Sequence, residues 1–78
     1  MNENIIFLKV KEIKSKKNGK KYYILNYIDS NYDAQMEFIS IDLYNQLVES
    51  DIEPLETVQA TYELNRFKKA VITAVETI

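Results

Sequence analysis

The chain has 78 residues, of which 46% are hydrophobic and 28% are charged, and its formal net charge is −2. Such a length holds one hydrophobic core, so we expect a single domain over residues 1–78, and the apolar content excludes a disordered tail. Cys and His are both absent, which excludes disulfides, thiolate nucleophiles, and the usual catalytic triads and transition-metal sites. A binding protein without a cofactor or metal is therefore expected rather than an enzyme.

The chain shows no membrane or export signal. Its longest apolar runs fall far short of the ~20 residues that a membrane-spanning helix needs. Residues 1–15 also lack the apolar core of a signal peptide. We expect a soluble protein, located in the cytoplasm of its host cell.

The first two strands are predicted to form a hairpin. Residues 5–14 alternate as a strand does, except that Ile13 is out of phase, which suggests a β-bulge. The pair Asn18-Gly19 is typical of a type I′ turn, in which both residues take positive φ angles. Residues 20–29 are therefore expected to return antiparallel to the first strand.

A third strand and a short helix come next. After a loop at 29–33, alternation predicts a strand over residues 35–41. One of its faces carries Gln35, Glu37, Ile39 and Ile41, and the other carries Met36, Phe38 and Ser40. Leu43, Leu47 and Val48 then fall at helical spacing, so a two-turn helix is predicted over residues 42–50.

Two more strands complete the pattern. Residues 57–64 alternate clearly after Pro54, and a last strand is predicted from about 67 to 77. The resulting order β-β-β-α-β-β is that of an all-β domain with one short helix, a five-stranded OB-fold-like barrel that commonly binds oligonucleotides on its strand 2–3 face. An SH3-like barrel or a small open α+β sheet would give a similar order.

Charge is segregated along the sequence. Residues 1–21 hold seven Lys against two Glu, residues 22–65 hold nine acidic residues and no Lys or Arg, and residues 66–78 are basic again. If folding brings the two ends together, one face is basic although the whole chain is acidic. Lys at the edges of strands would also discourage aggregation, without any role in binding.

The strongest candidate site is a basic turn that leads into two aromatic residues. Five Lys surround the predicted hairpin tip, and Tyr22 and Tyr23 follow directly. Single-stranded nucleic acid is bound by cations along its phosphates and by rings on which its bases stack. Because Tyr22 and Tyr23 lie on opposite faces of a strand, only one can be such a platform. Both Tyr could instead belong to the core or its rim.

A second cluster, Arg66-Phe67-Lys68-Lys69, repeats the basic and aromatic pattern near the start of the last strand. Taken alone, Phe67 is better explained as a core residue. Two such clusters at two strand junctions nevertheless favour a nucleic-acid surface. The segment from Asp29 to Asp33 has the opening spacing of a calcium loop, but Ala34 and Ser40 replace the required Gly and Glu, which argues against calcium.

The run Lys17-Asn18-Gly19-Lys20-Lys21-Tyr22 resembles a motif of the small single-stranded DNA-binding proteins of filamentous phages, the gene V protein class. That motif has a basic residue, a spacer and then Gly-Lys-x-Tyr, in which the family's Tyr stacks on bases. The likeness continues at Asp29 and at Phe67-Lys68, which resembles a Phe-Lys pair in the family's late DNA-binding hairpin. It implies an OB-type barrel that works as a dimer and contacts DNA through Lys17, Lys20, Tyr22, Phe67 and Lys68.

The chain departs from this family at several positions. Ser40 and Asp42 stand where the family offers a basic residue, and the last strand has Glu76 near the place of a family Arg. The late hairpin is also shorter and lacks the family's Gly residues. A weaker or differently routed DNA path is expected from these losses.

We therefore expect a single-stranded DNA-binding protein of a phage or mobile genetic element, which coats replication intermediates with little sequence preference. RNA is the alternative nucleic acid. The residues expected to bind are Lys16, Lys17, Lys20, Lys21, Tyr22, Arg66, Phe67, Lys68 and Lys69. A different function is also consistent with the sequence: a small barrel that binds another protein through the acidic middle block, as a phage-encoded inhibitor or a replication accessory.

Overall fold

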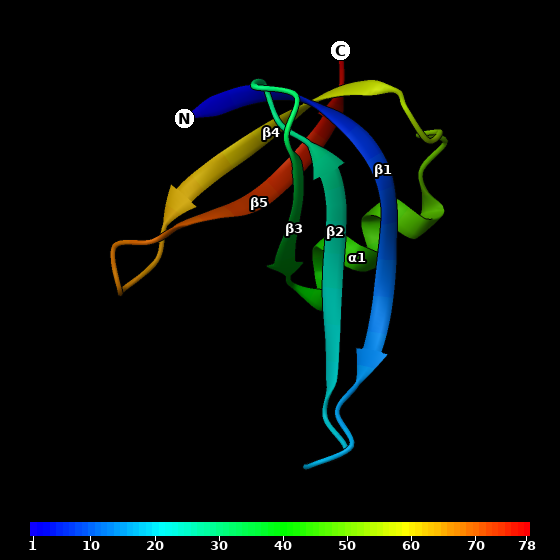
Figure 1. Cartoon of the computed structure of the whole chain (residues 1–78), viewed down its shortest axis with the longest axis vertical. Coiled ribbons are helices and arrows are strands. Elements are labelled where there is room, and N and C mark those ends of the chain that lie inside the picture. The colour runs from blue at the N-terminus through cyan, green and yellow to red at the C-terminus, as the bar shows by residue number, and fades with distance from the viewer.

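Alternating apolar residues build five strands, and the computed structural model describes all of residues 1–78 (Figure 1). The elements are β1 (Asn2–Lys14), β2 (Lys21–Ile28), β3 (Ala34–Ile39), α1 (Ile41–Glu49), β4 (Thr57–Leu64) and β5 (Ala70–Thr77). All strand pairs are antiparallel in the order β3-β2-β1-β4-β5, and β3 contacts β5 without a paired ladder. This arrangement confirms the predicted all-β fold, an OB-fold-like barrel with one short helix.

The core fills the inside of the curved sheet. Leu25 and Val58 are completely buried at its centre. Helix α1 begins after Ser40, whose Oγ accepts a hydrogen bond from the Leu43 N–H, and it buries Leu43 and Leu47 against the strands. Val48, predicted to share that face, is exposed instead. The helix has nine residues, and no helix has the length and apolar character needed to cross a bilayer.

Strand β1 is shared by both halves of the barrel. Its first residues pair with β4 and its later residues pair with β2, and the register shifts between Phe7 and Lys9. The bulge predicted near Ile13 is therefore wrong, because the irregularity lies where β1 passes from one partner strand to the other. Ile13 stays in register opposite Tyr22 and points away from the core, which explains its different phase.

The β1–β2 hairpin closes with a four-residue loop rather than the predicted type I′ turn. The Ser15 N–H donates to the Lys20 carbonyl oxygen at 2.8 Å, and the Gly19 N–H donates to the Ser15 carbonyl oxygen at 3.0 Å. Within this loop only Gly19 has a positive φ, of 69°. The side chain of Asn18 instead accepts a hydrogen bond from the Lys20 N–H at 2.9 Å. A longer loop results, which places four residues at the tip.

The predicted loop at 29–33 is confirmed as a turn that Asp29 organises. The Asp29 carboxylate accepts hydrogen bonds from the N–H groups of Asn31 and Asp33, at 2.9 and 3.0 Å, and from Gln35 Nε2 at 2.9 Å. The Asp33 N–H, helped by the Gln35 amide and the Asn31 N–H, lowers the pKa of Asp29. Both carboxylate oxygens are thus used to hold the turn between β2 and β3.

The turn at 65–69 has the same hydrogen bonds, with Asn65 in the place of Asp29. Its Oδ1 accepts from the N–H groups of Phe67 and Lys69, at 2.8 and 3.1 Å. Strand β5 therefore begins at Ala70, and the prediction that the last strand starts near 67 is wrong. Asn65 stops the strand pairing early, and residues 66–69 form the tip of the β4–β5 hairpin.

Leu55 offers a direct test of local backbone strain. The Glu56 N–H donates to the Glu53 carbonyl oxygen at 3.1 Å, so Pro54 and Leu55 are the central residues of a turn. Leu55 has a φ of 72° in a type II position that favours Gly, and its side chain is exposed. We expect Leu55→Gly to raise the free energy of unfolding by about 0.5–1 kcal/mol, because the left-handed cost exceeds the entropy that Gly adds to the unfolded chain.

Urea denaturation measures this change. Leu64→Gly is the matched control, because Leu64 is equally exposed but lies in the regular strand β4. That control should lower the free energy of unfolding by about 0.5–1 kcal/mol. A Leu55→Gly variant that loses stability as the control does would contradict the turn assignment.

Candidate nucleic-acid interface

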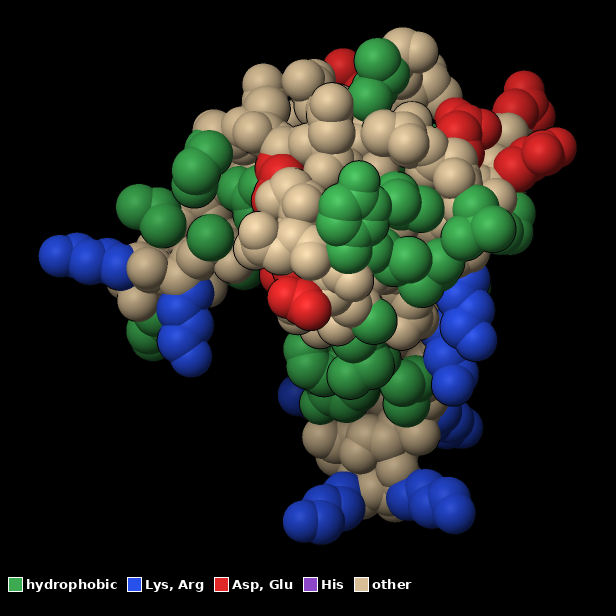
Figure 2. All heavy atoms as spheres, turned by 45° about the horizontal axis from the view of Figure 1, so that its top comes forward, with side chains coloured by type: hydrophobic (Ala, Val, Ile, Leu, Met, Phe, Trp, Pro, Cys, Tyr) green, Lys and Arg blue, Asp and Glu red, His purple; other side chains and the backbone are tan.

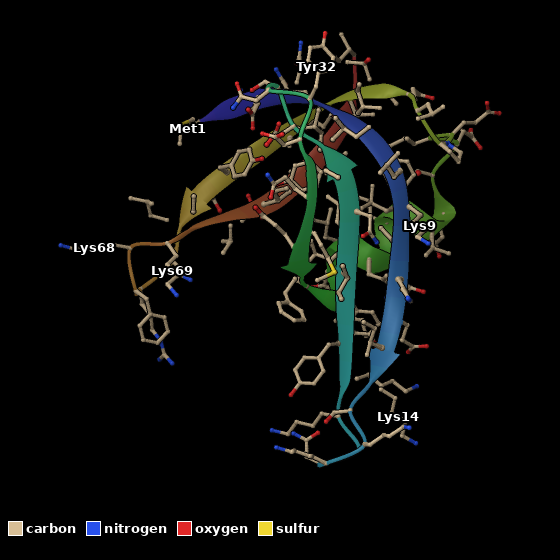
Figure 3. The ribbon with its side chains drawn as sticks, viewed as in Figure 1. Met1, Lys9, Lys14, Tyr32, Lys68 and Lys69 are labelled. Carbon is tan, nitrogen blue, oxygen red and sulfur yellow. The ribbon has the colours of Figure 1, made fainter.

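The β1–β2 hairpin extends beyond the barrel and concentrates positive charge at its tip. It forms one end of the molecule along its long axis, and Lys14 lies near that end (Figure 3). Five Lys side chains are exposed there: Lys14, Lys16, Lys17, Lys20 and Lys21. Only Lys21 has an acidic partner, since its Nζ lies 3.4 Å from a Glu12 carboxylate oxygen. Both side chains are exposed, so this ion pair is weak and leaves the tip basic.

Tyr22 and Tyr23 point to opposite sides of β2, as the strand alternation predicts. Tyr22 is 40% exposed on the outer face of the sheet, whereas Tyr23 packs on the core and on the Tyr44 ring, with centroids 4.6 Å apart. The Tyr22 hydroxyl lies 3.5 Å from Asn18 Nδ2 in the hairpin loop. Of the two rings, Tyr22 is thus the one available to a ligand.

A second ring stands beside Tyr22. Phe38 of β3 is 66% exposed, and its ring centroid lies 6.0 Å from that of Tyr22 at an angle of 64° between the planes. Met36, also on β3, is 61% exposed on the same face. Neither residue was among the predicted binding residues. The alternation in β3 was visible in the sequence, but apolar side chains occur on both of its faces, and only the register shows which face is outside.

Together these residues form an outer apolar patch, which we define as Ile13, Tyr22, Met36 and Phe38. Ile24 lies between them and is 3% exposed, although it is not part of the core cluster. Figure 2 shows hydrophobic side chains gathered on the stem of the hairpin, with Lys side chains below them and along one side. The patch is therefore bordered by cations.

The second basic cluster lies at the tip of the β4–β5 hairpin. Phe67 is 67% exposed, so the interpretation of this ring as a core residue is wrong. The Arg66 guanidinium carbon lies 4.8 Å from the centroid of the Phe67 ring, a cation–π contact. Lys68 and Lys69 are exposed beside them. The turn held by Asn65 places this segment at the tip of the hairpin, outside the barrel.

The two basic tips leave the barrel in different directions and do not touch. In Figure 3 the hairpin with Lys14 points down, while Lys68 and Lys69 lie at the left, and Figure 2 shows the molecule hollowed between these two projections. The structure thus brings the residues of segment 14–22 together, and it places residues 66–69 across an open space from them.

Part of the acidic block lies at the other end of the molecule. The end of α1 carries Glu49, and the segment from there to β4 carries Asp51, Glu53 and Glu56. This segment is at the upper right of Figure 1, far from the hairpin tip. Acidic side chains gather at the same place in Figure 2. These carboxylates are therefore remote from the outer apolar patch.

Two further tyrosines serve the fold. The Tyr27 hydroxyl donates to a Glu37 carboxylate oxygen at 2.8 Å, and the Tyr62 hydroxyl donates to Glu3 at 3.0 Å. The two hydroxyl oxygens lie 3.4 Å apart. Burial, followed by these hydrogen bonds, raises the pKa of Tyr27, and burial is also the main cause that raises the pKa of Tyr62. Both hydroxyls hold strands together rather than face a ligand.

Comparisons of the chain with protein-family models, with curated proteins and with solved structures find no significant match.

Proposed function

We propose that this protein binds single-stranded nucleic acid, DNA in the first instance, without catalysing a reaction. The observation that carries the proposal is the exposed pair of rings, Tyr22 and Phe38, at the base of a hairpin with five exposed Lys. Rings exposed on a sheet face give bases a stacking surface, and adjacent cations neutralise phosphates. Neither feature reads base identity, so binding with little sequence preference follows.

The roles divide between the two hairpins. Lys16, Lys17, Lys20 and Lys21 pair with phosphates at the β1–β2 tip, and Tyr22 stacks on a base. The tip at 66–69 would reach the same strand across the open space, with Phe67 as a further ring and Arg66, Lys68 and Lys69 as cations. A strand that spans both tips would explain why each carries a ring among cations.

A titration of labelled oligo-dT, followed by fluorescence anisotropy at three salt concentrations, tests the proposal. Four neutralised phosphates predict a log–log slope of about −3 or steeper for the association constant against salt. The absence of binding at low salt, or an affinity that does not change with salt, would refute the proposed function.

Association into a homodimer is part of the proposal. Beyond Tyr62 most residues of the β4–β5 hairpin are exposed, and Leu64 and Phe67 are 69% and 67% exposed. A two-stranded hairpin without further packing is only marginally stable in water. A second copy that covers this hairpin would bury its apolar side chains and join two nucleic-acid surfaces, and sedimentation equilibrium would measure the association.

The acidic segment favours a second candidate function, the capture of a basic protein. Glu49, Asp51 and Glu53 are exposed at the end remote from the basic hairpin, so such a partner would not compete with nucleic acid. Tyr22→Ala separates the two functions, because it should weaken binding to oligo-dT and leave the capture of a basic partner unchanged.

A further inference from the structure

The pairing of β1, β2 and β3 aligns side chains of different chemical character in rows across the outer face. Residues directly opposite each other in antiparallel strands share one face of the sheet. Two rows cross all three strands: Lys9, Asn26 and Met36 form the first, and Lys11, Ile24 and Phe38 form the second. The pair Ile13 and Tyr22 continues the series toward the hairpin tip.

These rows lie outside the barrel. Met36 and Phe38 are 61% and 66% exposed, and both Lys9 and Lys11 are exposed as well. Ile24 is buried, yet it is separate from the core cluster, so it is covered by its neighbours on the outer face. The position of Lys9 on the β1 side of the sheet is visible in Figure 3.

Both rows change from a charged side chain on β1 to an apolar side chain on β3. The β1 position holds a cation, the β2 position holds Asn26 or Ile24, and the β3 position holds Met36 or Phe38. Adjacent strands are about 4.8 Å apart, so the backbone positions that carry the cation and the apolar side chain are about 10 Å apart. A nucleotide is also charged at its phosphate and flat and apolar on the faces of its base.

We propose that a single strand lies along β2, with its phosphates over Lys9 and Lys11 of β1 and its bases over Met36 and Phe38 of β3. This inference rests on the proposed function and adds the path of the strand and three contact residues that the proposed function does not use, Lys9, Lys11 and Met36. Each row accommodates one nucleotide, and Asn26 is the polar side chain placed between phosphate and base.

The spacing of the rows sets the class of ligand. Successive rows are two residues apart, which is about 6.8 Å along an antiparallel strand. Bases in a duplex are stacked about 3.4 Å apart, half of that spacing. Neighbouring bases must therefore separate from each other and rest on the protein, so the face accepts an extended single strand and excludes a duplex.

The double variant Lys9→Gln, Lys11→Gln tests the path. It should make the log–log salt slope for oligo-dT shallower by about 1.4, because two phosphate contacts are lost, whereas Lys9→Arg, Lys11→Arg should keep the slope of the unmodified protein. If the unmodified protein binds and the Gln variant keeps the same slope and affinity, the path is wrong although the proposed function stands. If the unmodified protein does not bind oligo-dT at low salt, the proposed function itself fails.

An oligonucleotide with two adjacent 2-aminopurines tests the spacing. This base is quenched when it stacks on a neighbouring base or on an aromatic side chain, so separation of the pair should change its fluorescence. The double variant Tyr22→Leu, Phe38→Leu removes both quenching rings of the patch, and saturating protein compensates for its weaker binding. The fluorescence of the oligonucleotide should rise when it binds to that variant. Bound oligonucleotide whose 2-aminopurines stay as quenched as in the free strand would overturn the one-nucleotide-per-row arrangement.

Discussion

Removing both rings of the outer apolar patch, with Tyr22→Ala and Phe38→Ala together, should weaken binding to oligo-dT by about 30-fold or more. Stacking on an aromatic side chain contributes about 1–3 kcal/mol per base, and two platforms are lost. The two rings lie 6.0 Å apart and are both exposed, so the variant should keep the fold of the barrel. Anisotropy titration measures the affinity, and circular dichroism confirms the fold.

Two control variants make this result specific. Tyr22→Phe keeps the ring and should retain most of the affinity. Tyr32→Asn removes a Tyr that is 83% exposed in the turn between β2 and β3, and Asn tolerates the positive φ of that position. It should leave binding unchanged. Equal losses for the Ala pair and for Tyr32→Asn would contradict a stacking role for Tyr22 and Phe38.

Replacing four lysines of the β1–β2 hairpin by Gln should remove most of the contribution of this tip to the salt dependence of oligo-dT binding. The variant combines Lys16→Gln, Lys17→Gln, Lys20→Gln and Lys21→Gln. Four phosphate contacts correspond to a change of about 3 in the log–log salt slope, and at low salt the affinity should fall by about 100-fold. The Lys side chains are exposed and only Lys21 has a weak ion pair, with Glu12, so the stability of the fold should change little.

The matched control replaces the same four lysines by Arg. This control retains the charge and should retain the slope. A Gln variant whose slope equals that of the Arg variant would show that the hairpin tip does not contact phosphates. In that case the phosphate contacts would have to come from the cations of the outer face and of the β4–β5 tip.

The order of the strands and the helix could be predicted from the sequence because each has a clear period. Alternation in residues 57–64 and the helical spacing of Leu43 and Leu47 depend on local geometry alone. The same alternation showed that Tyr22 and Tyr23 lie on opposite faces. It could not show which face is outside, since this depends on how β2 is paired within the barrel.

Phe38 shows most clearly why the outer face of a strand could not be predicted from the sequence. On β3 the core takes Ile39, while Phe38 and Met36 are left outside, although all three are large and apolar. A shift of the strand by one residue would exchange these faces, and nothing local in the sequence prevents it. The exposed ring that stands beside Tyr22 therefore becomes visible only when the β2–β3 register is known.

The turns show a different limit. Asn18-Gly19 has the residues of a type I′ turn, yet the hydrogen bond between Ser15 and Lys20 selects a longer loop in which Asn18 acts through its side chain. Asn65 likewise ends the pairing of β4 and β5 through its side-chain oxygen. Competition between side-chain and backbone acceptors decided both turns, and this is why Phe67 lies at an exposed tip.

The central claim is that nucleic acid binds on the outer face of β1, β2 and β3 and at the adjoining hairpin. Titration of ¹⁵N-labelled protein with oligo-dT, followed by backbone amide chemical shifts, tests it most directly. Our account predicts that the largest changes fall in segments 9–13, 16–26, 36–38 and 66–69, while the acidic segment 49–56 changes little. Changes confined to segment 49–56, or none at saturating oligo-dT, would contradict it.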